Sequence, residues 1–312
     1  MKSQWKRFAS QFGRYGSAVL CAWSIGYCAQ APKGEAMPAE YQQVLTTLGK
    51  QGDFKAKVLK VNIPRNDIHV SIDGVHTPTP FGFGGWLAMT KGSGGMDVMM
   101  GDIVLLEDEV NPVMSAFLDN GLEVTALHNH FFFEEPRVFY MHVMGHGKPA
   151  DLARMANPAL DLLGHVPEKH GSATRSSGTS TAAAGKLDTA KIAEIVGHQG
   201  EENGQVYKIT VGRDDLKLKE MGAEINSRRG LNTWAAFYGT NADAMVAGDV
   251  AMLQKEVQPV LKALRGNGLE VVAIHQHMLD TNPPIIFLHY WGKGSTDKLA
   301  AGFKAALDQL GK

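Results

Sequence analysis

One segment of this 312-residue chain occurs twice, and that repetition limits the folds open to it. The first copy reads Gly121-Leu-Glu-Val-Thr-Ala-Leu-His-Asn-His130, and the second reads Gly268-Leu-Glu-Val-Val-Ala-Ile-His-Gln-His277. The spacing, 275 − 128 = 147 residues, also carries His142 onto His289. A single duplication at so long a period predicts two copies of one domain rather than a solenoid of short repeats.

Both halves carry the same order of predicted elements. Amphipathic periodicity, alternation and Gly or Pro stops indicate helices and strands in each half. In the first half the expected elements cover residues 39–49, 57–74, 81–89, 97–106, 109–120, 121–130, 137–144 and 150–163. We therefore expect an α+β fold of two tandem homologous domains, each a mainly antiparallel sheet with helices packed on one side.

Composition predicts the domain boundaries. Residues 1–36 join early Lys and Arg residues to a short apolar run, which is typical of a signal peptide or lipoprotein leader. The first repeat domain covers residues 37–165, a flexible linker rich in small and polar residues covers 166–186, and the second repeat covers 187–312. We expect the repeats to pair about a pseudo-twofold axis, because open sheet edges gain by joining. The alternative is two independent beads.

The charge balance excludes one class of partner. The formal net charge is −1 and no basic stripe occurs, so we expect no nucleic-acid partner. The leader predicts an exported protein, periplasmic or associated with the cell envelope, that contacts a membrane only through the leader or through a lipid on Cys28. Cys21 and Cys28 are the two cysteines of the chain, so a metal ion must be held by other side chains. The oligomeric state stays open.

The repeated histidines predict a metal site in each half. His128 and His130 lie two residues apart on a predicted strand, so they point to the same face. A turn centred near residue 135 would place His142 directly opposite His128, and the same reasoning places His289 opposite His275. Three neutral imidazoles with an open position suit zinc first, while copper, iron, manganese and nickel remain open. The competing interpretation is that these histidines only form hydrogen bonds with their neighbours.

Further side chains extend the candidate sets. The first half adds Glu134 and His146, whereas Lys293 replaces His146 in the second half. We therefore expect the first site to be richer and the second to be weaker or structural. The candidate metal ligands are His128, His130, His142, Glu134, His146, His275, His277 and His289.

The first histidine segment also echoes a cupin motif, in which His-x-His is followed after a short gap by Glu. The third histidine comes too early, and a predicted helix precedes the motif where a cupin has strands. A cupin barrel is therefore the secondary fold hypothesis.

Two arginines offer a second binding hypothesis. Arg65 and Arg213 are equivalent, and an aspartate, Asp67 or Asp215, follows each of them two residues later. These arginines could bind an anionic ligand, or each could form a buried ion pair with its aspartate. Trp86 and Trp234 are also equivalent, and we expect both to fill the core; the alternative is that they stack on a ligand.

Several of these segments together resemble a known family. Gly101-Asp-Ile-Val-Leu105, Glu109-Val-Asn-Pro-Val113, Ala126-Leu-His-Asn-His130 and Pro136-Arg137 are similar to the LppY/LpqO-type family of bacterial exported proteins and lipoproteins. The resemblance implies export and a doubled domain, and it implies little chemistry.

The residues themselves favour an exported protein with a histidine-rich transition-metal site in each repeat. Such a site could support metal-dependent chemistry on a small molecule. The alternative is a non-enzymatic envelope module that binds a metal ion or ligand for sensing or storage.

Overall fold

The computed structural model describes residues 35–166, 180–181 and 186–312. The predicted leader, with Cys21 and Cys28, and most of the predicted linker lie outside the described residues. Residues Glu35–Lys312 group into one unit that contains both repeats. Within that unit the predicted α+β fold with two tandem domains is confirmed.

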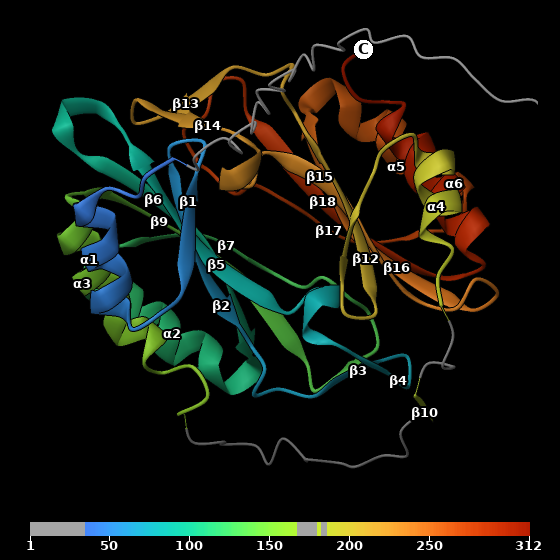
Figure 1. Ribbon diagram of the computed structural model, residues 1–312, viewed down its shortest axis with the longest axis horizontal. Coiled ribbons are helices and arrows are strands. Elements are labelled where there is room, and N and C mark those ends of the chain that lie inside the picture. Colours follow the sequence, from blue (N-terminus) through green and yellow to red (C-terminus); the bar gives the residue numbers. More distant parts are fainter. Residues whose placement is uncertain (1–34, 167–179, 182–185) are drawn as a thin grey trace, which may run out of the picture. The chain divides into compact units, whose positions relative to one another are not determined.

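The first repeat is built on a six-stranded antiparallel sheet in the order β1-β2-β5-β6-β9-β7. Its strands are β1 (Gly52–Lys55), β2 (Val58–Pro64), β5 (Gly84–Lys91), β6 (Asp97–Leu106), β7 (Glu123–His128) and β9 (Val138–Gly147). Three helices cover one face of this sheet (Figure 1): α1 (Ala39–Leu48), α2 (Glu107–Asp119) and α3 (Pro149–Leu160). A smaller sheet contains β10 (Ser180–Thr181), β4 (Val75–Thr77), β3 (Val70–Ile72) and β8 (Glu134–Glu135), and the short helices are η1 (Thr79–Phe81) and η2 (Ser93–Gly95).

The second repeat has the same plan, with the sheet order β11-β12-β15-β16-β18-β17. Its strands are β11 (Glu201–Asn203), β12 (Val206–Gly212), β15 (Asn232–Gly239), β16 (Ala244–Leu253), β17 (Glu270–His275) and β18 (Ile285–Gly294). The helices are α4 (Thr189–Val196), α5 (Val257–Gly266) and α6 (Thr296–Leu307), with the short helices η3 (Ser227–Arg229) and η4 (Gln254–Glu256). A two-stranded sheet pairs β13 (Leu218–Glu220) with β14 (Ala223–Ile225).

Side chains alternate between the two faces of each strand, and one face of each sheet packs against the helices. In β2, Leu59, Val61 and Ile63 belong to the core beneath the helices of the first repeat, so Lys60 points to the opposite face. The central strand β6 is buried along almost its whole length, because both of its faces are covered. Its bounds match the strand predicted over residues 97–106, whereas β1 was not predicted separately.

The two sheets pack against each other through the faces that carry no helices. Two clusters of buried apolar residues contain side chains from both repeats. One joins Val104 and Tyr140 to Trp291, and the other joins Met144 to Phe287. The repeats are therefore paired, as expected, and the bead-like alternative is wrong.

The two equivalent Arg-x-Asp segments form buried ion pairs. The Arg65 guanidinium donates to Asp67 Oδ1 at 2.8 Å, to Glu109 Oε2 at 2.6 Å and to the Val104 carbonyl at 2.7 Å. Arg213 repeats the arrangement with Asp215, Glu256 and Ala251.

These contacts favour the ion-pair alternative over the binding of an anionic ligand by Arg65 and Arg213. The nitrogen atoms of each guanidinium donate to partners inside the same repeat. The ion-pair interpretation is the one that the structure supports, and each pair ties the start of a helix to the sheet.

The Glu109→Gln substitution tests the weight of this contact. Glu109 is 3% exposed and also accepts hydrogen bonds from the Leu106 and Gly164 amides, so its loss leaves the buried guanidinium with Asp67 as its remaining charge partner. We expect a loss of about 1.5–3 kcal/mol in the free energy of unfolding, measured by urea denaturation. The matched control, Lys191→Met, breaks an exposed pair with Asp297 and should leave the urea midpoint close to that of the parent, because solvent screens an exposed pair. Equal losses in the two variants would contradict the prediction.

Candidate metal centre

A row of polar and aromatic side chains crosses the inner face of each sheet. In the first repeat, Trp86 pairs with Asp102, Asp102 pairs with His142, and His142 pairs with Ala126. In the second repeat the equivalent row reads Trp234, Asp249, His289 and Ala273. Because neighbouring pairs share a face, each row points toward the other sheet.

The histidine strands have a different register from the predicted one. His128 lies opposite Tyr140, and His142 lies opposite Ala126, so the prediction that His142 faces His128 directly is wrong. The segment after His128 leaves the hairpin, because Glu134 and Glu135 pair with β3 instead of closing a simple turn. The second repeat shows the same shift, with His275 opposite Phe287 and His289 opposite Ala273. A shift of two residues keeps every histidine on the same face.

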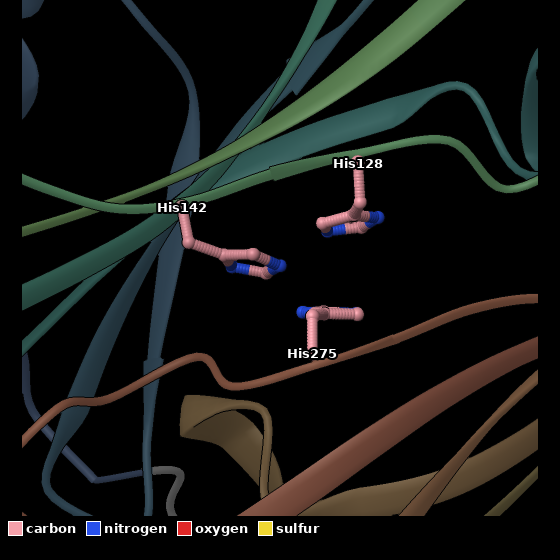
Figure 2. Close-up of side chains that lie close together, drawn as sticks. All are labelled: His128, His142 and His275. Carbon is pink, nitrogen blue, oxygen red and sulfur yellow. The ribbon is translucent and has the colours of Figure 1, made fainter.

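Six imidazole rings meet between the two sheets. Figure 2 shows His128 and His142 projecting from one sheet toward His275 on the other. The ring centroids of His128 and His275 lie 3.7 Å apart, and those of His128 and His142 lie 5.0 Å apart. The ring centroids of His130 and His289 lie 3.7 Å apart, and those of His142 and His277 lie 3.8 Å apart. The histidines of the two repeats therefore form one cluster instead of two separate sites.

Three groups of three histidines could each hold a metal ion, since one ligand atom from every member lies within 4.8 Å of the others. The groups are His128, His142 and His275; His128, His130 and His289; and His275, His277 and His289. Two of these groups combine both repeats. The convergence expected within one repeat occurs in the second half, but the equivalent first-half trio is not among the groups found in the described part of the chain. His130 instead stacks on Tyr140 and turns toward His289.

Glu134 and His146 do not join any of these groups. Glu134 pairs with Ile72 in the smaller sheet, which takes it away from the histidine hairpin. His146 is exposed near the end of β9, four residues and about 13 Å along the strand from His142. The expectation that the first half holds a richer site therefore lacks support from the geometry.

Burial keeps the clustered imidazoles neutral. Desolvation, followed by repulsion from His275, lowers the pKa of His128 to about 2, and desolvation lowers that of His275 to about 4. Desolvation first and the neighbouring histidines second hold the pKa values of His130, His142, His277 and His289 well below the usual value. Neutral imidazole is the form that binds a metal ion.

The rings also lack protein partners for their polar atoms. All six histidines have at least one buried ring nitrogen without a hydrogen bond, and His130, His277 and His289 have two each. Buried polar atoms in folded proteins are almost always paired, so a cluster of unpaired ones requires an explanation such as a bound ion. The histidine set fits a transition metal, for which nitrogen lone pairs are suitable ligands.

Sequence reasoning missed four charged residues beside this cluster. Asp102 and Asp249 occupy the rows described above, and Lys60 and Lys208 lie on the same inner faces, over Trp86 and Trp234. The available signal was the spacing 208 − 60 = 148, which repeats a lysine at an inward-facing position of a strand. The two tryptophans are half-buried and support these lysines, so the expectation that they simply fill the core was incomplete.

Residues 42–162 and 190–309 each match the family described as Domain of Unknown Function (DUF1259). The chain belongs to this family. The two matches cover the two repeats and together account for most of the chain. No curated protein matches this DUF1259 protein.

Solved structures give weak likenesses to the DUF1259 chain. A trimeric bacterial microcompartment shell protein, PduB, is 12% identical with a TM-score of 0.18, covering 82% of this chain and 90% of its own. EtuB from Clostridium kluyveri is 8% identical with a TM-score of 0.21, covering 83% of this chain and 89% of its own. TM-scores of this size do not indicate a shared fold. Within the described ranges of this DUF1259 protein, every helix is too short or too polar to span a bilayer.

The neutral histidines predict a loss of stability in mild acid. Their pKa values in the folded protein lie below the unfolded value of about 6.5, so the unfolded chain takes up protons first as the pH falls. The histidine contribution to the stability of the metal-free protein should be constant above about pH 7 and fall below about pH 6.5, by up to about 1.4 kcal/mol per pH unit for each histidine. Urea midpoints at pH 7.5 and 5.5, with a chelator present, measure this.

Two variants separate the cluster from other histidines in that experiment. His277→Gln should reduce the pH dependence by about one histidine's share, because Gln does not titrate. His146→Ala removes an exposed ring outside the cluster and is the matched control. An unchanged urea midpoint between pH 7.5 and 5.5 in the parent protein would contradict the prediction.

Proposed function

We propose that this protein binds transition-metal ions between its two repeats, with the imidazoles of the histidine cluster as ligands. The observation that carries this proposal is the set of buried ring nitrogens without hydrogen-bond partners, gathered from two strands of each repeat. Leaving a buried polar atom unpaired costs about 1–3 kcal/mol. Coordination of a metal ion would remove that cost for every nitrogen that binds it.

Zinc is the first expectation for the ion. All three groups supply nitrogen ligands alone, and three neutral histidines with one open position are a known zinc arrangement. Copper, iron, manganese and nickel also bind imidazole, and the metal content of the purified protein decides among them.

The three-histidine groups favour chemistry over storage as the use of the metal. An ion held by three imidazoles retains an open position for water or a small molecule, which metal-assisted catalysis requires. The alternative is a non-enzymatic module for sensing or storage. It is favoured by the shared membership of the groups, because His128, His275 and His289 each belong to two of them and could saturate one ion.

We further propose that the protein is exported, as a periplasmic or envelope-associated member of the LppY/LpqO-type group. Support comes from the basic and apolar character of residues 1–36. Membrane contact would arise only through that leader or through a lipid at Cys28. The direct test is the mass of the mature protein recovered from the envelope, which distinguishes cleavage, lipidation and retention of the leader.

The double substitution His128→Ala with His275→Ala tests metal binding. Each of the three groups contains His128 or His275, so the double variant removes a ligand from every group. We expect about one or two ions per chain in the parent protein and the loss of most of this metal in the variant, measured by elemental mass spectrometry. His146→Ala serves as the control because it removes an exposed histidine outside the groups and should leave metal content unchanged.

The metal proposal fails on either of two results. The first is a parent protein that is purified without chelators, contains no transition metal and takes up none when zinc or copper is added. The second is a double variant that is folded by circular dichroism and binds as much metal as the parent.

X-ray absorption at the metal edge separates chemistry from storage. Three imidazoles and one oxygen ligand per ion, the result we expect, leave a position that a small molecule can occupy. Four or more imidazoles per ion would instead support the storage or sensing alternative. A cyanide or azide titration that shifts the spectrum of the Co²⁺-substituted protein provides an independent check, because these anions bind only at an open position.

A further inference from the structure

Two lysines face each other's repeat beside the histidine cluster. Lys60 lies on β2 and Lys208 lies on β12, at equivalent positions. Lys60 Nζ lies 4.6 Å from the centroid of the Trp86 ring, and Lys208 Nζ lies 3.9 Å from that of Trp234. Both side chains are half-buried. Within the described residues, neither ammonium makes a hydrogen bond or an ion pair with a carboxylate.

The nearby carboxyl groups do not neutralise these lysines by direct contact. Asp102 and Asp249 lie on the same inner faces, yet each has a buried Oδ1 atom without a hydrogen-bond partner. Asp249 Oδ1 lies 3.9 Å from His289 Nδ1, so this carboxyl group contacts the histidine cluster instead. Burial lowers the pKa of both lysines to about 8, so they remain mostly charged at neutral pH. The two ammonium groups therefore lie at this interface without a carboxylate of the described chain in direct contact.

The lysines also lie next to the proposed metal ligands. The Trp234 ring that supports Lys208 lies 6.4 Å from the His130 ring. The Trp86 ring approaches Gly230 of the second repeat, and His277 Nδ1 borders the same glycine. Each lysine–tryptophan pair therefore borders the part of the histidine cluster that comes from the opposite repeat.

We propose that Lys60 and Lys208 together bind the anionic group of a small carboxylate or phosphate ligand whose other end reaches the histidine cluster. Only the contact between the ligand and the histidine cluster rests on the proposed metal site. The binding of the anionic group by the two lysines does not. Two partly desolvated ammonium groups on the inner faces of the two sheets repel each other, and an oxyanion bound by both would supply the missing acceptors. The two tryptophans offer flat faces that hold the lysine stems in place.

Calorimetric titration of the full chain with inorganic phosphate and with succinate tests this proposal. Lys60→Met and Lys208→Met retain the apolar stem over each tryptophan and remove the charge. Each single variant should weaken binding of the preferred anion about tenfold or more, since a charged hydrogen bond contributes about 1.5–3 kcal/mol, and the double variant should abolish it. Lys219→Met, at an exposed position of β13, is the matched control and should bind like the parent.

The two anions and the metal content separate the outcomes. Tighter binding of phosphate assigns a phosphoryl ligand, and tighter binding of succinate assigns a carboxylate ligand. Metal content is measured on the same samples. Anion binding that depends on the lysines in a protein without metal would leave this site standing while the metal proposal fails. A metal-loaded protein that binds neither anion, or a double variant that binds as tightly as the parent, would overturn the inference.

Discussion

The face-to-face packing of the two sheets is the constraint on which the rest of this structure depends. Each sheet has one face covered by its own helices, and the opposite face packs against the other repeat. Apolar residues from both repeats fill most of that interface. The histidines occupy its remaining part, so the packing of the sheets is also what brings the two halves of the cluster together.

Burying six histidines between the two sheets has a cost in folding free energy. Each buried ring nitrogen left unpaired would cost about 1–3 kcal/mol, so partners for these nitrogens would add to the stability of the folded chain. The buried Arg65 and Arg213 networks and the two helix-covered cores act against that cost. Binding of a structural metal ion can contribute about 10–16 kcal/mol, which is the right size to offset it.

Duplication produced two halves that are similar without being equivalent. His130 stacks on Tyr140, whereas its counterpart His277 stacks on Phe287. Lys293 replaces His146 and forms an ion pair with Asp73 of the first repeat at 2.9 Å. The candidate metal-binding groups also differ between the repeats. Within the described residues, a group of three histidines from a single repeat occurs only in the second repeat. A two-ion arrangement built on this cluster would therefore have two different sites.

The sequence by itself determined the doubled α+β plan, the order of the elements and the face on which each histidine lies, because periodicity and parity along a strand are local properties. The register of the histidine hairpin was not local: it depends on Glu134 and Glu135 pairing with β3, a contact between distant segments. Glu134 and His146 are predicted ligands because they are close in sequence to His130 and His142. The fold places both side chains outside the histidine groups. Only the tertiary structure decided that His128 meets His275 and that Lys60 and Lys208 line the same interface, since contacts between the two repeats leave no spacing signal within either one.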